Sequence, residues 1–252
     1  MRILLTNDDG IHARGLQALR TIANSLSDDV WTIAPETDQS GQARSLTLSQ
    51  PLRVREVAER TFAVNGTPTD CVIMGVRAIV DGPVDLVLSG VNQGTNIGDA
   101  VFYSGTVAGA MEGAFLGIPS VAISQAYRTD GTRAVQWGTS ERHAPAILRT
   151  LVEDGFEAGG PINVNFPDCG PDELVGVRVV RQGRFEHALH VEERRDGRNL
   201  PYNWLTFKGR EGAEQPEADI GALRARYAAV TPLKLDLTHD GELERLAGTF
   251  AP

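Results

Sequence analysis

The chain has 252 residues, of which 41% are hydrophobic and 23% are charged, so it is long enough and apolar enough to form a large folded core. Its 24 Lys and Arg against 33 Asp and Glu give a net charge of −9, which argues against a nucleic-acid polymer as partner. No apolar run has the length of a membrane span, and the two cysteines, Cys71 and Cys169, are too few for a disulfide framework, so we expect a cytoplasmic protein outside the membrane.

The first half of the chain alternates apolar runs with amphipathic segments. Compact apolar runs predict buried strands over 2–6, 30–34, 85–89 and 120–124. Helical periodicity predicts helices between them over 16–26, 68–80 and 106–116, the second capped by Thr67 with Pro68 in its first turn. The alternation indicates an α/β protein with a doubly wound, mostly parallel sheet, which binds ligands beyond the carboxyl ends of its strands.

The second half is less regular. Its patterns predict helices over 140–152 and 218–228 and strands over 162–166, 175–181 and 233–237. The segment 192–204 (EERRDGRNLPYNW) is charged and rich in turn residues, which predicts an extended arm or hairpin. Because such an arm fits a compact monomer poorly, we expect it to reach a neighbouring subunit in a homodimer or in a homotetramer made of two dimers.

Two adjacent carboxylates, Asp8 and Asp9, follow the first predicted strand. They repel each other and are costly to desolvate, and a divalent cation would remove both penalties. An oxygen-rich site of this kind suits magnesium, manganese or calcium better than zinc. The alternative is a solvated turn at Asp9-Gly10, which the tripeptide alone does not exclude.

Ser40 and Asn92 lie in loops that follow two other predicted strands. Both are neutral oxygen donors, and they would complete a metal site that leaves positions open to water and substrate. Each also has an ordinary interpretation, Ser40 as a hydroxyl bonded to local backbone and Asn92 as a turn residue.

The segment Tyr103-Ser104-Gly105-Thr106 leads directly into a predicted helix. A glycine-bearing loop at a helix N-terminus offers backbone N–H groups and a positive dipole end to a phosphate, and Ser104 and Thr106 add hydroxyls. Asn96 would add a further donor. The alternative is a simple helix cap at Ser104 or Thr106.

Several separated blocks of the sequence resemble the SurE family of stationary-phase survival proteins, which are 5′/3′-nucleotidases. In chain order the blocks are ILLTNDDGIHARGLQAL from Ile3, AP-x4-SG from Ala34 with RSLTL after it, VNGTPTDCV from Val64, the block from Asp85 to Ser124 with SGVNQGTNIG and YSGT, INVNFP from Ile162, GVRVVRQGRF from Gly176, EERRDGRNLPYNW from Glu192, and VTPL from Val230. The chain departs from the family where a late TD-x2-A and a Gly-Tyr pair are usual, since Ala218-Asp219 and Arg226-Tyr227 stand there.

The resemblance implies one domain over 1–252, with a Rossmann-like catalytic core in 1–130 and an oligomerisation arm in 131–252. It also implies a divalent cation, Mg²⁺ or Mn²⁺. The residues that match the metal ligands of the family are Asp8, Asp9, Ser40 and Asn92. Those that match its phosphate contacts are Asn96, Ser104, Gly105 and Thr106.

The activity implied is hydrolysis of nucleoside 5′- and 3′-monophosphates to nucleoside and phosphate. Direct attack by water is favoured over a covalent aspartyl-phosphate, because the two aspartates are adjacent rather than separated by one residue, and either Asp8 or Asp9 would position or deprotonate that water. Two alternatives remain open: a broad acid phosphatase or exopolyphosphatase with the same site, and a nucleotide-binding module without turnover.

Overall fold

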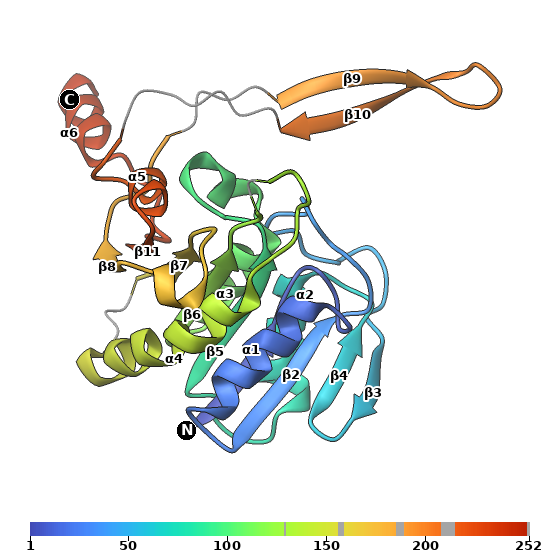
Figure 1. Cartoon of the computed structure of the whole chain (residues 1–252), viewed down its shortest axis with the longest axis vertical. Helices are drawn as coiled ribbons and strands as arrows, with labels where there is room; N and C mark the ends of the chain where they lie inside the picture. The colour runs from blue at the N-terminus through green and yellow to red at the C-terminus, as the bar shows by residue number, and fades with distance from the viewer. Residues whose placement is uncertain (129, 156–158, 185–188, 208–214, 251–252) are drawn as a thin grey trace.

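A nine-stranded mixed sheet forms the centre of the molecule (Figure 1). The computed structural model describes residues 1–128, 130–155, 159–184, 189–207 and 215–250. The strands stand in the order β3-β4-β2-β1-β5-β6-β7-β11-β8. Their bounds are β1 (Arg2–Thr6), β2 (Asp29–Pro35), β3 (Val54–Ala58), β4 (Thr61–Val64), β5 (Leu86–Gln93), β6 (Ser120–Gln125), β7 (Ile162–Phe166), β8 (Gly176–Val179) and β11 (Tyr227–Pro232).

The strands from β4 through β7 in this order all run parallel. At one side the sheet is extended by β3, which pairs antiparallel with β4. At the other side β11 pairs antiparallel with β7 and parallel with β8. The predicted α/β fold with a mostly parallel sheet is therefore confirmed, and the carboxyl ends of the neighbouring strands β2, β1 and β5 lie at one edge.

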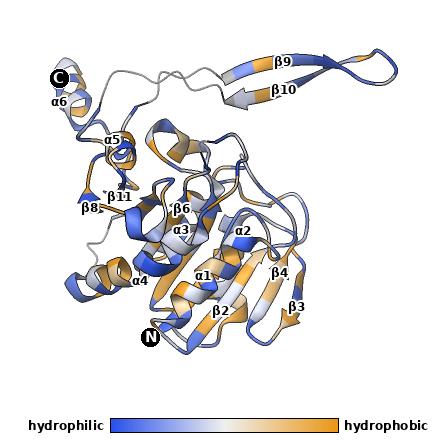
Figure 2. Cartoon of the chain, in the orientation of Figure 1, coloured by the Kyte–Doolittle hydropathy of each residue, from blue (hydrophilic) through white to orange (hydrophobic). Residues whose placement is uncertain are grey.

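Helices cover both faces of the sheet. On one face α1 (Arg14–Asn24) packs beside α4 (Trp137–Asp154), and on the other α2 (Pro68–Met74) packs beside α3 (Gly105–Phe115). Strand β1 supplies both cores, because Ile3 and Leu5 pack with α1 whereas Leu4 packs with α2. Each such fully buried side chain contributes about 1.5–3 kcal/mol to folding. Figure 2 shows the same concentration of hydrophobic residues in the sheet.

The first-half predictions agree with the structure. Strands β1, β2, β5 and β6 and helices α1, α2 and α3 all occur where expected, with ends shifted by a few residues. Thr67 caps α2 as predicted: its hydroxyl accepts the Asp70 N–H, and the Asp70 carboxylate accepts the Thr67 N–H at 2.9 Å. Beyond Met74 the chain continues in one π-helical stretch, Gly75–Ile79.

In the second half of the chain, two predicted elements differ from the structure. The helix predicted over 218–228 is too long, since α5 (Asp219–Arg224) stops early and the chain enters β11, where pairing with strands on both sides outweighs the helix propensity of its alanines. The strand predicted over 233–237 is wrong. Those residues lie beside the segment that precedes β7. Two backbone hydrogen bonds, from Leu233 N to Pro161 O and from Leu235 N to Gly159 O, join the two segments, but neither segment is a strand there.

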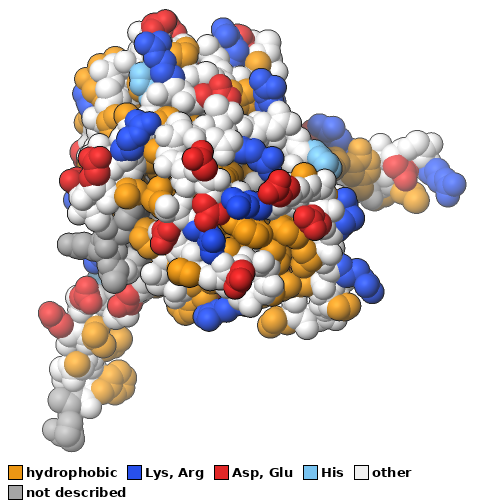
Figure 3. Space-filling model, turned by 90° about the horizontal axis from the view of Figure 1, so that it is seen from below, with side chains coloured by type: hydrophobic (Ala, Val, Ile, Leu, Met, Phe, Trp, Pro, Cys, Tyr) orange, Lys and Arg blue, Asp and Glu red, His pale blue; other side chains and the backbone are white. Residues whose placement is uncertain are grey.

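The predicted arm is a hairpin of β9 (Leu189–Arg195) and β10 (Pro201–Phe207) that projects from the body of the molecule (Figure 1). The last helix, α6 (Asp240–Thr249), was not predicted and has no buried residue. Acidic and basic side chains are interspersed on the face seen in Figure 3. In the part of the chain that the structure describes, no helix combines the length and the hydropathy needed to cross a membrane.

Candidate active site

The loops that follow β1, β2 and β5 meet at the carboxyl edge of the sheet. The backbone N–H of Gln39 donates to the Asp8 carbonyl at 2.8 Å, which joins the first two loops. The Asp9 Oδ2 accepts the backbone N–H of Gln93 at 3.4 Å, which joins the first to the end of β5. The structure therefore brings together the loops that carry Asp8, Asp9 and Ser40 with the strand end that carries Asn92.

Asp8 lies against the N-terminus of α3. The Thr106 hydroxyl donates a hydrogen bond to Asp8 Oδ1. Gly105 permits this approach, because a side chain there would collide with the Asp8 side chain. Burial raises the pKa of the Asp8 carboxyl above its usual value of 3.8, while the hydrogen bond from the Thr106 side chain opposes that rise. The N-terminus of α3 thus favours the negative charge of Asp8, whereas the loss of hydration on burial disfavours it.

Asp9 is the more exposed of the pair, and its pKa is raised to about 7. Burial is the largest cause and the neighbouring Asp8 charge comes next, whereas the Gln93 N–H lowers the pKa. The charges acting on the Asp9 carboxyl, those of Asp8 and Asp38, are both negative. An anionic substrate would therefore need a positive group that these residues do not supply.

Ser40 lies in the exposed loop after β2, and its side chain is held by Asp38. The Ser40 hydroxyl donates to Asp38 Oδ1 at 2.6 Å, and the Ser40 N–H donates to the same oxygen at 2.8 Å. The Asp38 charge also raises the pKa of both Asp8 and Asp9. Sequence reasoning missed Asp38; its place two residues before Ser40 was the available signal.

Asn92 lies in the last part of β5, where the register against β6 shifts between Ser89 and Asn92. Such a bulge re-aims the side chains that follow it. The Asn92 side-chain nitrogen donates to the Gly94 carbonyl at 2.9 Å. This bond uses the donor end of the amide and leaves the oxygen as the end suited to a cation.

Ser104 caps α3, with its hydroxyl oxygen accepting the Val107 N–H at 3.0 Å. The ordinary capping interpretation therefore holds for Ser104, and the Thr106 hydroxyl serves Asp8. Capping and anion binding are compatible, because a cap satisfies one of several free N–H groups in the first turn. We call Ser104, Gly105 and Thr106 the phosphate cradle; Gly105 and Thr106 place it directly against Asp8.

Asn96 lies deeper, in a buried polar network. Its N–H donates to Asn165 Oδ1 at 2.8 Å, its side-chain nitrogen donates to Ser124 Oγ at 2.9 Å, and its carbonyl accepts from Asn163 at 2.8 Å. Among the hydrogen bonds of the described residues, none joins Asn96 to Asp8 or Thr106. In this structure Asn96 supports the loop that enters the cradle.

A second support for that loop is Asp219, a fully buried residue of α5 that sequence reasoning did not assign. Its carboxylate accepts the N–H groups of Gly98 at 2.9 Å, Gly183 at 3.0 Å and Ile220 at 2.8 Å. Burial raises the Asp219 pKa, and these bonds oppose the rise. Asp219 therefore links the start of the 3₁₀ turn Gly98–Tyr103, which ends at the cradle, to the chain entering the arm.

The residues fit a divalent cation with an open coordination sphere. Two buried or half-buried carboxylates with raised pKa values carry a desolvation penalty that a cation would offset. Within the described ranges, no group of three or more His, Cys, Asp or Glu side chains is placed to hold a metal. A metal here would therefore depend on Asp8, Asp9, neutral oxygens and water, as magnesium and manganese sites do.

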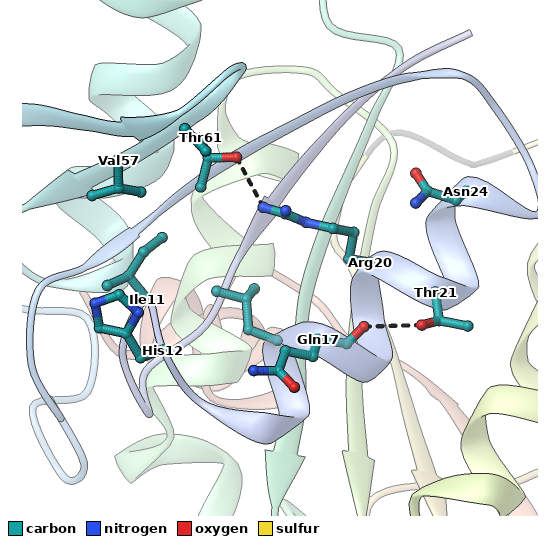
Figure 4. Close-up of a pocket in the computed structure, with 10 residues that line it drawn as sticks. Ile11, His12, Gln17, Arg20, Thr21, Asn24, Val57 and Thr61 are labelled. Carbon is teal, nitrogen blue, oxygen red and sulfur yellow. Dashed lines mark hydrogen bonds between the residues drawn. The ribbon is translucent and has the colours of Figure 1, made fainter.

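A groove of about 380 Å³ runs beside this site, between α1 and the β3–β4 hairpin (Figure 4). Ile11 and His12, which directly follow the aspartate loop, line it together with Arg20. Arg20 reaches across to β4 and donates to the Thr61 hydroxyl at 2.9 Å. The same nitrogen donates to Thr32 at 2.9 Å, so the guanidinium fastens α1 to the sheet.

The chain is similar to known proteins along its whole length. Proteins named 5′-nucleotidase SurE are 59% identical in Mesorhizobium japonicum and 56% identical in Chelativorans sp., each match covering all of both chains. The one from Brucella anthropi is 58% identical over 94% of this chain and 93% of its own. The crystal structure of the SurE protein from Aquifex aeolicus has a TM-score of 0.85 at 35% identity, covering 99% of each chain. Residues 3–188 match the family model described as survival protein SurE, and the chain belongs to that family.

Proposed function

We propose that this protein is a divalent-metal-dependent phosphomonoesterase that hydrolyses nucleoside 5′-monophosphates, and 3′-monophosphates as well. The observation that carries the proposal is the Asp8–Asp9 pair at the end of β1, with Asp8 packed against the N-terminus of α3. Two carboxylates that burial makes costly to ionise lie beside a helix end that favours an anion, as a metal-assisted phosphate site requires. Relatives over the full chain carry the name 5′-nucleotidase SurE.

In this proposal Asp8, Asp9, Ser40 and Asn92 hold the cation, for which Mg²⁺ and Mn²⁺ are the candidates. When bound, a divalent cation supplies positive charge for the phosphoryl oxygens and makes water more acidic.

The residues of the cradle have distinct tasks. The backbone amides at Gly105 and Thr106 bind phosphate oxygens and stabilise charge in the transition state, with Ser104 and Asn96 holding the loop in place. Asp8 or Asp9 positions the attacking water and accepts its proton. Of the two carboxylates, Asp9 is the more exposed and Asp8 is buried, which favours Asp9 as the group that reaches the water.

We also propose that residues 1–130 form the catalytic core and that the arm in the C-terminal part joins subunits into a homodimer or homotetramer. The arm exposes Val191, Trp204 and Leu205, with 67%, 55% and 73% of their surface accessible. Apolar side chains on an isolated hairpin favour burial against another chain. A cytoplasmic location is supported by Cys71 and Cys169, which are both free.

The test is phosphate release from chelator-stripped protein with and without Mn²⁺ or Mg²⁺. The substrates are a panel of nucleoside monophosphates, pyrophosphate, polyphosphate and an aryl phosphate. Metal-restored release that is fastest from nucleoside monophosphates supports the proposal. Faster release from the aryl phosphate or polyphosphate would make the protein a broad phosphatase or exopolyphosphatase, and no release with any metal would favour a binding module.

A further inference from the structure

One buried charge of α3 lies outside the site described above. Glu112 is 7% exposed and stands two turns beyond the cradle. Its Oε2 pairs with Arg44 Nη2 at 2.9 Å. The Arg44 guanidinium also lies over the Phe115 ring, 4.9 Å from its centroid, so both contacts are made to α3. A buried carboxylate needs such a partner, because leaving it unpaired is strongly unfavourable.

Arg44 belongs to the loop of residues 36–50, which also carries Ser40; we call this segment the Ser40 loop. Its first part is tied to the site by the bond from Gln39 N to Asp8 O. Its last part is tied to α2, since Thr47 Oγ1 donates to Asp70 at 2.6 Å and Thr67 donates to the Ser45 carbonyl at 2.8 Å. Between these ties the chain turns through Ala43, whose φ is +50°.

We infer that the Arg44–Glu112 ion pair is a positioning clasp that fixes Ser40 relative to the phosphate cradle. Ser40 lies in the part of the loop between the Gln39 and Arg44 attachments, and its own side chain bonds to Asp38 of the same loop. The clasp connects this part to α3, the helix whose first turn contacts Asp8. The distance between the Ser40 loop and the cradle is therefore fixed. A site whose residues come from two separate elements requires such a fixed distance.

The inference deepens the proposed function, because it concerns how the proposed metal site is assembled. A purely stabilising ion pair and a positioning clasp have different consequences when they are broken. A stabilising pair, when broken, lowers the melting temperature and leaves the affinity of a distant site unchanged. A positioning clasp, when broken, weakens cation binding at Ser40 and frees the Ser40 loop even where the protein stays folded.

The experiment compares Arg44→Met, Arg44→Lys and Glu112→Gln with the wild-type chain. The matched control is Arg142→Met, which breaks the exposed Arg142–Asp172 pair on another part of the surface. Mn²⁺ affinity is measured by calorimetry and amide exchange by mass spectrometry over residues 38–47. We expect Arg44→Met and Glu112→Gln to bind Mn²⁺ about 10-fold more weakly, as loss of a supporting contact around metal ligands does, and to exchange faster in the loop alone.

Arg44→Lys keeps the positive charge and should recover part of the affinity, and Arg142→Met should match the wild type. A folded Arg44→Met protein with unchanged Mn²⁺ affinity and unchanged loop exchange would overturn the inference. If Arg44→Met does not fold, the same comparison is decided by Glu112→Gln and Arg44→Lys. Mn²⁺ binding without any phosphate release in the wild type contradicts the proposed function alone, whereas a wild type that does not bind Mn²⁺ contradicts both.

Discussion

Gly105 stands so close to Asp8 that a Cβ on Gly105 would lie 2.8 Å from the Asp8 Cβ and 3.0 Å from Asp8 Oδ2. Relief of this collision would require α3 to move away from the end of β1, which carries the aspartates. We expect Gly105→Ala to fold with a loss of about 1–3 kcal/mol from overpacking and to lose about 100-fold in turnover, since small displacements of reacting groups are costly. Gly138→Ala, where the added Cβ lies 3.4 Å from its nearest neighbour, Pro171, is the control and should keep full activity.

Replacing either aspartate by asparagine tests the metal assignment. Asp8→Asn and Asp9→Asn preserve shape but remove a negative charge from the proposed ligand pair. We expect turnover with saturating Mn²⁺ to fall at least about 100-fold in each, while the melting temperature of the metal-free protein stays the same or rises, because a carboxyl that is costly to ionise has been removed. Retention of most of the metal-dependent rate by Asp8→Asn would disprove the site.

Thr106 is expected to act through its hydroxyl, which donates to Asp8 Oδ1. Thr106→Val keeps the volume and removes the donor, so the Asp8 carboxylate loses a hydrogen bond that favours its charged form. We expect at least about a 10-fold loss in kcat/KM, as for other groups that orient metal ligands, with recovery in Thr106→Ser. Equal rates in Thr106→Val and the wild type would remove the side chain from the proposed site.

Asp219 should give the stability of the protein a measurable pH dependence. Its pKa in the folded protein is raised above the usual 3.8, so its contribution to stability is full below pH 3.8 and falls as the pH rises through the folded pKa. Asp219→Asn should reduce this decline in urea unfolding above pH 4 and leave the part that Asp8 and Asp9 contribute through their own raised pKa values. It should also lower the free energy of unfolding by about 1–3 kcal/mol, because an amide cannot accept all three N–H bonds.

Asp130→Asn is the control for that measurement. The Asp130 carboxylate is exposed, and its hydrogen bonds with Thr132 lower its pKa to about 2. Its contribution is therefore present above pH 3.8 and is lost only as the pH falls towards 2. The pH dependence of Asp130→Asn should match that of the wild type above pH 4; an equal flattening in both variants would mean that Asp219 is not its source.

The arm can be tested by solution mass. Leu205 of β10 lies opposite Val191 of β9, and the two form an exposed apolar pair. Leu205→Glu should weaken subunit association by about tenfold or more if the arm packs on a neighbouring chain. Val152→Glu on α4 changes a surface residue outside the arm and should leave the mass unchanged. A wild-type protein that is monomeric at micromolar concentration would contradict the proposed assembly.

The sequence predicted those parts of the fold in which local pattern and tertiary environment agree. Strands β1 and β5 are continuous apolar runs because helices cover both of their faces. Strand β3 was not predicted, because it lies at the edge of the sheet and carries mostly exposed side chains. The helix predicted over 218–228 overran the first two residues of strand β11, because the local sequence says nothing of the two strands that pair with β11.

The candidate site, like the fold, could be predicted only in part from the sequence. Asp8 and Asp9 could be selected because a charged pair at the end of a buried strand conflicts with its surroundings. Asp219 could not, since it is one acidic residue among many until the fold brings it to its partners, and the signal for Asp38 was its place two residues before Ser40. Arg44 and Glu112 are 68 positions apart in the chain, and no local pattern joins them.

The place of β11 in the sheet also determines when the fold can be completed. This strand lies between β7 and β8 although it follows both in the chain, and the whole arm is synthesised before it. Until residues 227–232 leave the ribosome, β7 is an open strand edge and β8 has no partner, which is the condition in which nascent chains associate wrongly. A chain cut before Tyr227 would therefore retain every proposed ligand and yet be left with an exposed strand edge, so completion of the fold depends on a segment that carries none of the proposed site residues.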